Sequence, residues 1–254
     1  MNKGIFSGCG NNFYICYYYN IKVEDIISIC NTYHTDGFIM LEQIDSFRMH
    51  FYNQDGSRAP MCGNGIRCLT YFMYLNNLVE PYKNIPIITD SGIVNVSITN
   101  INPMTVKVNL GKPSFRKEDM DCLDIYINKI IEINNISIPI TNVFLGTHHT
   151  IIFDETMKKY AKEIQNNSIF KKGTNVDFVK VLNKNNIHVD TYERGVGWTN
   201  ACGTGAASSF VVANTLGLVN NNITVHFKNE SVHVKEVNNE IYLEGPCVLD
   251  LKLE

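Results

Sequence analysis

Two segments of the chain place a cysteine directly before a glycine-rich stretch that could begin a helix. They start Cys62-Gly-Asn-Gly and Cys202-Gly-Thr-Gly. The free N–H groups and dipole at a helix N-terminus bind a carboxylate or phosphate, and they lower the pKa of a cysteine at the junction. A thiolate in such a place can accept or deliver a proton. Each segment is therefore a candidate for acid–base chemistry.

The two segments are copies of one pattern. A single copy would be weak evidence, because a glycine-rich turn with an inert cysteine has the same sequence. The copies align without a gap at an offset of 202 − 62 = 140 residues. Tyr52 and Tyr192 match at that offset, and so do Ser91 and Ser231. We infer an internal duplication of one α/β unit.

The elements around the cysteines are mostly strands. Helices are predicted at Val23–Thr32, at Glu155–Gln165 and after each of the two cysteines, where the sequence is apolar on most faces and therefore suited to burial inside a curled sheet. Short β-branched or aromatic runs between turn residues predict the strands. These are Phe13–Tyr19, Phe47–Tyr52, Ile85–Thr89, Ile93–Ile98, Thr105–Leu110, Thr150–Phe153, Asn175–Val181, His188–Glu193, Thr224–Phe227, Ser231–Val237 and Glu240–Glu244.

The predicted fold class is α/β (α+β), with two pseudo-symmetric domains that are each a curled mixed β-sheet or barrel around a central helix. The boundary is expected near Gly111–Lys117, between an N-terminal half of residues 1–113 and a C-terminal half of residues 114–243. The last strand, about residues 244–254, is expected to return to the first half. If a pseudo-two-fold axis relates the halves, the two cysteines would face each other across one active-site cleft.

Composition excludes several classes of function. The chain has 254 residues and a formal net charge of −3, which gives no reason to expect nucleic acid or an anionic membrane surface as a partner. No stretch has the roughly 18 apolar residues that a spanning helix needs. The polar residues after Lys3 interrupt any signal peptide. The sequence therefore predicts a cytoplasmic protein that does not bind a membrane.

The eight cysteines are irregularly spaced and include no Cys-x-x-Cys pair, so neither a disulfide framework nor a zinc site is expected. No Walker A loop or well-placed dinucleotide motif accompanies them. We expect no cofactor and no metal. Two thiols on opposite sides of one carbon would fit stereoinversion of an amino acid: one removes the α-proton, the other returns a proton, and the helix N–H groups hold the carboxylate.

On its motifs, the chain resembles the diaminopimelate epimerase family of amino-acid epimerases, which work without pyridoxal phosphate. The resemblance covers nearly the whole chain, and the two cysteine motifs are its most specific part. The matching segments are Gly8-Cys-Gly-Asn-Asn-Phe13, Asn53-Gln-Asp-Gly-Ser57, Met61-Cys-Gly-Asn-Gly-Ile-Arg67, Gly173-Thr-Asn-Val-Asp-Phe178 and Glu193-Arg-Gly-Val-Gly-Trp-Thr199-Asn-Ala-Cys-Gly-Thr-Gly205.

The resemblance implies a role for each matching residue. Cys62 and Cys202 would be the catalytic proton-transfer groups of an isomerase in lysine biosynthesis. Three sets of residues would bind the substrate. The carboxylate at the reacting carbon would be held by the backbone N–H groups of Gly63, Asn64, Gly203 and Thr204. Amino groups would be bound by Asn11 and Glu193, and a distal carboxylate by Asn53, Asn175 and Arg194. A fork-shaped arginine side chain suits that last task.

Three positions depart from the family's pattern. Thr147, in Gly146-Thr-His-His149, stands where the family has a substrate-binding asparagine, and Asn12 stands for an aspartate. Tyr33-His-Thr35 replaces the usual glycine-rich lead to Asp36. His148 and His149 are expected to be strand or loop residues that could line the altered pocket rather than metal ligands.

The resemblance favours conversion of LL- to meso-diaminopimelate, so the expected partner is a small-molecule amino-acid substrate. The alternative is a racemase of another amino acid, such as histidine, on the same scaffold. A thiol redox protein in which Cys62 and Cys202 cycle through a disulfide fits less well, since no Cys-x-x-Cys is present. A noncatalytic binding relative would not need both cysteines. A homodimer stays open, because the sequence does not give the oligomeric state.

Overall fold

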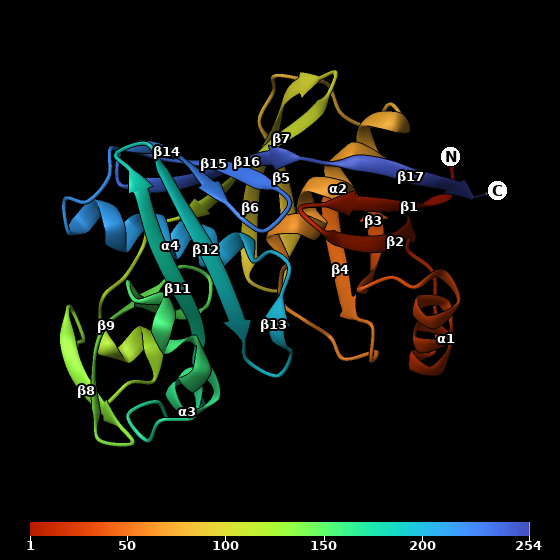
Figure 1. The fold of residues 1–254 in the computed structure, drawn as a ribbon. Helices are drawn as coiled ribbons and strands as arrows, with labels where there is room; N and C mark the ends of the chain where they lie inside the picture. The colour runs from red at the N-terminus through yellow and green to blue at the C-terminus, as the bar shows by residue number, and fades with distance from the viewer. Residues whose placement is uncertain (254) are drawn as a thin grey trace. The chain divides into compact units, whose positions relative to one another are not determined.

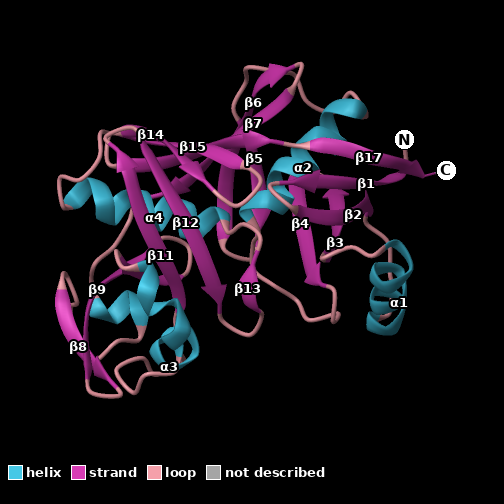
Figure 2. Ribbon diagram, viewed as in Figure 1, coloured by secondary structure: helices cyan, strands magenta, loops and turns pink. Residues whose placement is uncertain are grey.

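The computed structural model describes residues 1–253, and these form two compact units. The first holds residues 1–109 together with the segment from residue 244, and the second holds Leu110–Leu243. Strands predominate over helices in both (Figure 2). The predicted α+β class is confirmed.

In the first unit, eight strands hydrogen-bond in the order β17–β1–β2–β3–β4–β5–β6–β7 (Figure 1). Cys247, just before β17, donates its N–H to the carbonyl of Met104 at the start of β7, so the sheet curls until its two ends meet. The strands are β1 (Lys3–Gly8), β2 (Asn11–Tyr17), β3 (Gly37–Gln43), β4 (Phe47–Asn53), β5 (Ile85–Thr89), β6 (Gly92–Ile101), β7 (Met104–Gly111) and β17 (Val248–Leu253).

In the second unit, the order is β8–β9–β10–β11–β12–β14–β15, and the short β13 pairs with the end of β12. The strands are β8 (Lys129–Ile133), β9 (Ile136–Phe144), β10 (His148–Ile152), β11 (Asn175–Asn183), β12 (Asn186–Glu193), β13 (Gly197–Thr199), β14 (Asn222–His226), β15 (Ser231–Val237) and, leading back to the first unit, β16 (Glu240–Pro246).

The two units repeat one series of strand pairings. Starting from β17–β1 in the first unit and from β8–β9 in the second, the series is antiparallel, antiparallel, parallel, antiparallel, parallel, antiparallel. A shared series of six pairings supports the duplication that the sequence offset indicates.

Each unit encloses one buried helix, which begins directly after its cysteine. The helices are α2 (Gly63–Leu75) and α4 (Gly203–Thr215), both of 13 residues and displaced by 140 positions. Helix α2 packs against β1, β2, β3 and β6, and α4 packs against β9–β12, β14 and β15. Fully buried Phe72 and Phe210 are the largest apolar side chains of the two helices. Burial of the apolar side chains of these helices stabilises each unit.

The other helices agree only in part with the sequence prediction. Helix α1 (Val23–Tyr33) forms as predicted and is one residue longer. The single α-helix predicted for Glu155–Gln165 is wrong, because the segment is a 3₁₀ turn, η2 (Glu155–Tyr160), followed by the short α3 (Ala161–Gln165). A further 3₁₀ turn, η1, spans Lys117–Met120. Strand β3 was not predicted, because its buried Gly-Phe-Ile-Met-Leu run pairs on both edges and shows no alternation.

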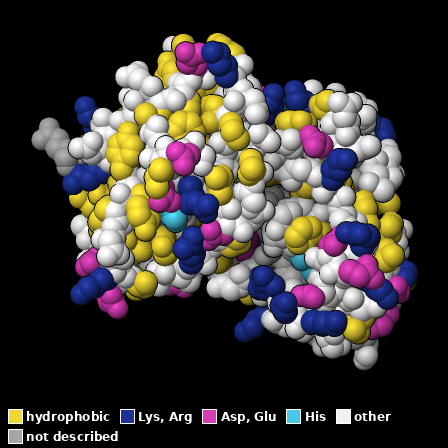
Figure 3. All heavy atoms as spheres, turned by 180° about the vertical axis from the view of Figure 1, so that it is seen from behind, with side chains coloured by type: hydrophobic (Ala, Val, Ile, Leu, Met, Phe, Trp, Pro, Cys, Tyr) yellow, Lys and Arg dark blue, Asp and Glu magenta, His cyan; other side chains and the backbone are white. Residues whose placement is uncertain are grey.

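The surface carries charges of both signs. On the face seen in Figure 3, Lys and Arg side chains lie among Asp and Glu side chains rather than in a field of one sign. Within residues 1–253, no helix has the length and apolar character needed to cross a membrane.

Candidate active site

Cys62 is the N-cap residue of α2. Its backbone is extended, with φ −136° and ψ 120°, and its Sγ accepts a hydrogen bond from the Gly65 N–H at 3.3 Å. The first N–H groups of an α-helix have no partner within the helix. The sulfur takes the third of them and leaves those of Gly63 and Asn64 available to an anion. A Cβ at Gly65 would lie 2.9 Å from Ile39 Cδ1, so a larger residue there would push the end of the Ile39 side chain aside.

A chain of side-chain hydrogen bonds leads from α2 to Asp36, which lies just before β3. Asn64 Nδ2 donates to Asn11 Oδ1 at 2.7 Å, and Asn11 Nδ2 donates to Asp36 Oδ2 at 3.2 Å. Asn12 exchanges two backbone–side-chain hydrogen bonds with Asp36, both 3.0 Å long, and its Nδ2 donates to the His34 carbonyl. An aspartate at position 12 could not make that last bond. The asparagine at position 12 therefore adds a bond to the C-cap residue of α1.

Asn53 lies at the end of β4, where a tight turn holds it. Its Nδ2 donates to Ser57 Oγ at 2.9 Å, and its carbonyl accepts from the Gly56 N–H. Gly56 has a φ of +79°, and a Cβ there would lie 2.5 Å from a Val23 methyl group of α1. The turn therefore requires glycine, and it packs against α1 while the Asn53 side chain stays partly exposed.

Arg67, one turn into α2, was not expected to be special, yet it is fully buried. One guanidinium nitrogen donates to the Gly63 carbonyl at 3.3 Å and another to Cys9 Sγ at 3.1 Å. Its Nε has no partner, and no ion pair among residues 1–253 includes it. A buried guanidinium without a carboxylate is costly. Arg67 therefore places a positive charge directly behind the first turn of α2.

Cys202 is the N-cap residue of α4, the same position in the second unit. Its Sγ accepts from the Gly205 N–H at 3.3 Å and lies 3.4 Å from Thr204 Oγ1. Burial, reinforced by the nearby Glu193 and Asp177 carboxylates, raises the pKa of the Cys202 thiol well above its usual range. The lowered pKa that the sequence predicted is thus wrong for Cys202, since burial outweighs the helix N-terminus.

Glu193 ends β12 and faces Cys202. Its Oε1 accepts from Thr199 Oγ1 of β13 at 2.9 Å, and its carboxyl group also hydrogen-bonds the Cys202 thiol. Burial raises the pKa of Glu193.

Three predicted binding residues of the second unit converge beside β10 and β11. The Asn175 amide nitrogen donates to Thr147 Oγ1 at 3.5 Å and to the His148 carbonyl at 3.1 Å. Its Oδ1 accepts the Arg194 N–H at 2.9 Å. The Arg194 guanidinium donates to the Lys172 carbonyl at 3.1 Å and is exposed. Asn175 thus links Thr147 to Arg194 and leaves guanidinium donors for a ligand.

His149 and Asp177 form a buried pair that the motif analysis did not identify, although it named His149 as a residue that could line the pocket. Asp177 Oδ2 lies 2.6 Å from His149 Nδ1, and His149 Nε2 lies 3.0 Å from Thr204 Oγ1. Asp177 Oδ1 accepts from Thr191 Oγ1 at 2.7 Å. His149 and Asp177 are fully buried and 28 positions apart in sequence, so only the parallel pairing of β10 with β11 reveals them.

His148 points elsewhere and does not form part of this group. Both of its ring nitrogens are buried without a hydrogen-bond partner, and its ring packs edge-on against Phe170. Burial, with the nearby His149 and Arg194, lowers the pKa of His148 to about 3. A neutral ring with this environment belongs to the core.

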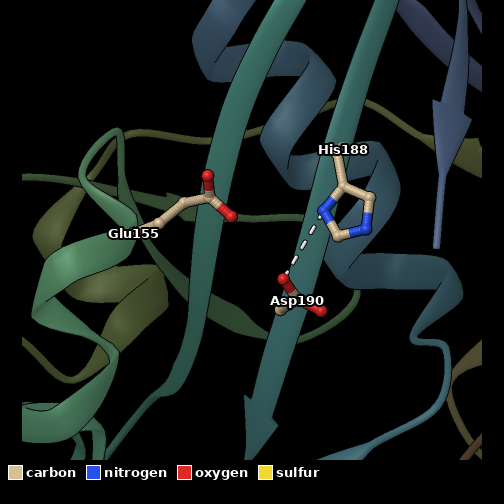
Figure 4. A group of neighbouring side chains, drawn as sticks. All are labelled: Glu155, His188 and Asp190. Atoms are coloured by element: carbon tan, nitrogen blue, oxygen red, sulfur yellow. Dashed lines mark ion pairs between the residues drawn. The ribbon is translucent and has the colours of Figure 1, made fainter. Parts of the chain in front are cut away.

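A separate cluster of Glu155, His188 and Asp190 has the donor atoms of a metal site (Figure 4). The Lys158 ammonium group already bridges the two carboxylates, at 3.0 Å from Glu155 and 2.7 Å from Asp190. Side chains alternate along β12, so Asp190 points away from the face that carries buried Thr191. This cluster is an ion-pair network on the other side of the strand.

The sequence matches a known family model. Residues 31–116 and 141–249 match the model for diaminopimelate epimerase. A diaminopimelate epimerase from Alkaliphilus metalliredigens is 34% identical, with 94% of this chain and 92% of that protein covered. One from Halothermothrix orenii is 36% identical, with 84% and 80% covered.

Solved structures share the fold at low sequence identity. A PhzF-family phenazine biosynthesis protein from Bacillus anthracis superposes with a TM-score of 0.72 at 16% identity, covering 100% of this chain and 99% of that one. A probable proline racemase from Agrobacterium radiobacter superposes with a TM-score of 0.69 at 11% identity, covering 99% and 92%. At these identities, the likeness concerns the fold alone.

Proposed function

The chain belongs to the diaminopimelate epimerase family, and from that premise we propose that it converts LL-diaminopimelate to the meso isomer with two thiols. The observation that carries the proposal is the duplicated N-cap cysteine: Cys62 and Cys202 begin equivalent helices, and each accepts the third helical N–H. One such element could be structural. A matched pair supplies two acid–base groups of the same kind, as inversion at one carbon requires.

The proposed reaction moves one proton from each side of the α-carbon. The thiolate of one cysteine removes the α-proton, and the thiol of the other delivers a proton to the opposite face. The mechanism therefore requires both sulfurs to act on the same carbon. The N–H groups at positions 63 and 64, or 203 and 204, would bind the α-carboxylate and stabilise the charge that develops on it.

The remaining binding roles follow the charges of the substrate. Glu193 and Asn11 would bind amino groups. Arg194, with donors left over from its bond to Lys172, would bind the distal carboxylate together with Asn53 and Asn175. We place the enzyme in the cytoplasm, where free thiols stay reduced.

Thr147 favours one alternative, a racemase of another amino acid. Its hydroxyl lies beside Asn175 where the family has an asparagine, so the pocket there offers one amide fewer. Incubation of the protein in D₂O with diaminopimelate, histidine and other amino acids, followed by NMR, decides between the substrates. Loss of the α-proton signal of diaminopimelate is the expected result. Exchange with histidine alone would select the alternative.

Single cysteine variants test the two-thiol mechanism. Cys62→Ser and Cys202→Ser should each abolish inversion, because a hydroxyl group does not ionise near neutral pH. Cys122→Ser is a matched control: Cys122 accepts a hydrogen bond from Asn142, which a hydroxyl can also accept, and it should stay active. Full activity of either N-cap variant, or no exchange with any amino acid under reducing conditions, would overturn the proposal.

A further inference from the structure

Arg67 and Cys9 form a buried pair in the first unit that the proposed reaction does not use. Arg67 is fully buried, Cys9 is 2% exposed, and Arg67 Nη2 donates to Cys9 Sγ at 3.1 Å. The N–H groups that bond the sulfurs of Cys62, Cys122 and Cys202 lie further away, at 3.3–3.4 Å. Hydrogen bonds with a charged partner are shorter than neutral ones. The short contact therefore directs the charge of Arg67 at one sulfur.

Cys9 is the group bonded to Arg67 that can carry a compensating negative charge. Among residues 1–253, Arg67 takes part in no ion pair with a carboxylate. Its bond to the Gly63 carbonyl is to a group that does not ionise. A guanidinium left uncompensated in the interior is costly, whereas a thiolate at Cys9 would pair with it. An adjacent arginine also favours the thiolate form of a cysteine.

Two other cysteines lie near Arg67 but differ from Cys9. A Cβ on Gly8 would lie 3.2 Å from Cys68 Sγ and 3.5 Å from Arg67 Nη2, so both groups pack against the end of β1. Burial raises the pKa of Cys68 well above its usual range and that of Cys247 to about 12. These two are therefore thiols at neutral pH, and the thiolate is the nucleophilic form of a cysteine.

The Arg67 guanidinium has a donor left on the edge that faces Cys9. Nε and Nη2 lie on the same edge of a guanidinium, and Arg58 uses both to bind the two oxygens of Asp90. In Arg67, Nη2 bonds Cys9, whereas Nε is buried without a partner. A buried N–H group without an acceptor costs free energy. The edge can therefore bind two acceptor atoms, and the sulfur supplies one.

Cys9 belongs to a tight turn between β1 and β2. Both turn residues have positive φ, 52° at Cys9 and 79° at Gly10, which is the conformation of a type I′ turn. Gly10 is exposed, while the Cys9 side chain turns inward to Arg67. The sulfur is therefore carried by a surface turn, although it is itself buried.

We propose that Cys9 is an oxidation site for hydrogen peroxide and that Arg67 holds the sulfenate that forms. The thiolate attacks one peroxide oxygen, so that an S–O bond forms as the O–O bond breaks and hydroxide leaves. Hydroxide then takes the proton of the sulfenic acid, and the products are a sulfenate and water. The sulfur gives up the two electrons that reduce the peroxide. The new oxygen accepts the free Nε–H of Arg67, while Nη2 keeps its bond to the sulfur.

Peroxide treatment of the full reduced chain tests the site. After the peroxide is removed, the protein is denatured with dimedone, which traps sulfenic acid, and with an alkylating reagent that blocks remaining thiols. Mass spectrometry then reads each cysteine separately. Cys9 should oxidise about tenfold faster than Cys16 and Cys30, because the thiolate reacts and burial raises the pKa of the other two. Equal rates at the three positions, or a disulfide between Cys9 and another cysteine, would overturn the proposal.

Substitutions of Arg67 separate its charge from its second donor. Arg67→Met should slow the oxidation of Cys9 by about tenfold or more. Arg67→Lys keeps the charge but lacks the paired donors, so Cys9 should still oxidise while added thiol reduces its sulfenate faster. Arg58→Met is the matched control, since its donors bind Asp90, and it should change neither rate. An unchanged oxidation rate in Arg67→Met would remove Arg67 from the site.

NMR of labelled cysteine gives a second reading on the unmodified protein. At neutral pH, the Cβ shift of Cys9 should be that of a thiolate and the Cβ shift of Cys247 that of a thiol. A thiol at Cys9 would overturn the ion pair, even if Arg67→Met fails to fold. The inference does not rest on the proposed function, and none of these readings depends on turnover.

Discussion

Replacing Gly205 by alanine is expected to disrupt the second unit much more than the equivalent change disrupts the first. A Cβ at position 205 would fall inside van der Waals contact with Asp177 Oδ1 and 2.8 Å from Thr191 Oγ1. Both atoms belong to buried side chains that hydrogen-bond each other. Neither can move away without breaking that bond, because the Asp177 carboxylate is also held by His149.

The size of the effect can be worked out from three contributions. Overpacking a core costs about 1–3 kcal/mol, and a buried hydrogen bond left unmade costs about 1–3 kcal/mol more. Alanine recovers about 1 kcal/mol of helix propensity relative to glycine. The free energy of unfolding should therefore fall by about 1–5 kcal/mol, with a middle value of about 3 kcal/mol.

Urea denaturation of Gly205→Ala, Gly65→Ala and Gly63→Ala gives the comparison. A Cβ on Gly63 meets nothing within 4 Å, so that variant should keep or slightly gain stability. Gly65→Ala should fall between, because the 2.9 Å contact is with the flexible end of Ile39. A Gly205→Ala variant as stable as Gly63→Ala would refute the reasoning, since it would mean that the Asp177 carboxylate is free to move.

Three further variants test single features. His148→Phe should reduce the loss of stability at acid pH. The pKa of His148 is depressed to about 3 in the folded protein, so the unfolded chain takes up a proton first as pH falls below 6.5, and the free energy of unfolding falls by about 1.4 kcal/mol per pH unit. The same pH dependence in the variant and the wild type, measured by urea denaturation, would contradict this. Arg67→Met should lower the free energy of unfolding by less than about 1 kcal/mol or raise it, because replacing a buried charged residue by an apolar one is often neutral or stabilising. A loss above about 3 kcal/mol would contradict this and would show that the bond to Cys9 is essential. Thr147→Asn should lower the KM for diaminopimelate by supplying an amide beside Asn175, and a KM that is unchanged or higher would remove Thr147 from the pocket.

Local sequence predicted the parts of the site that depend on near neighbours. Each N-cap cysteine and the helix after it follow from spacing within four residues, so Cys62 and Cys202 begin helices as predicted. The capped 3₁₀ turn at Glu155–Tyr160 was mistaken for α-helix, since both have similar apolar spacing over six residues.

The rest of the site depends on strand pairing, which one sequence does not reveal. His149 meets Asp177 because β10 runs parallel to β11, and Thr191 joins them because β12 is antiparallel to β11. The pKa of Cys202 also depends on this environment: the helix N-terminus was visible in the sequence, whereas the buried carboxylates that oppose it were not.

The central claim is that two thiols act from opposite faces of one α-carbon, and isotope incorporation tests it most directly. LL-diaminopimelate is incubated with the reduced enzyme in D₂O, and both isomers are recovered after the first few per cent of reaction. The account predicts deuterium at the inverted carbon of the product, while the recovered starting isomer keeps its proton. A product that retains the original proton would indicate one base acting on both faces and would contradict the account.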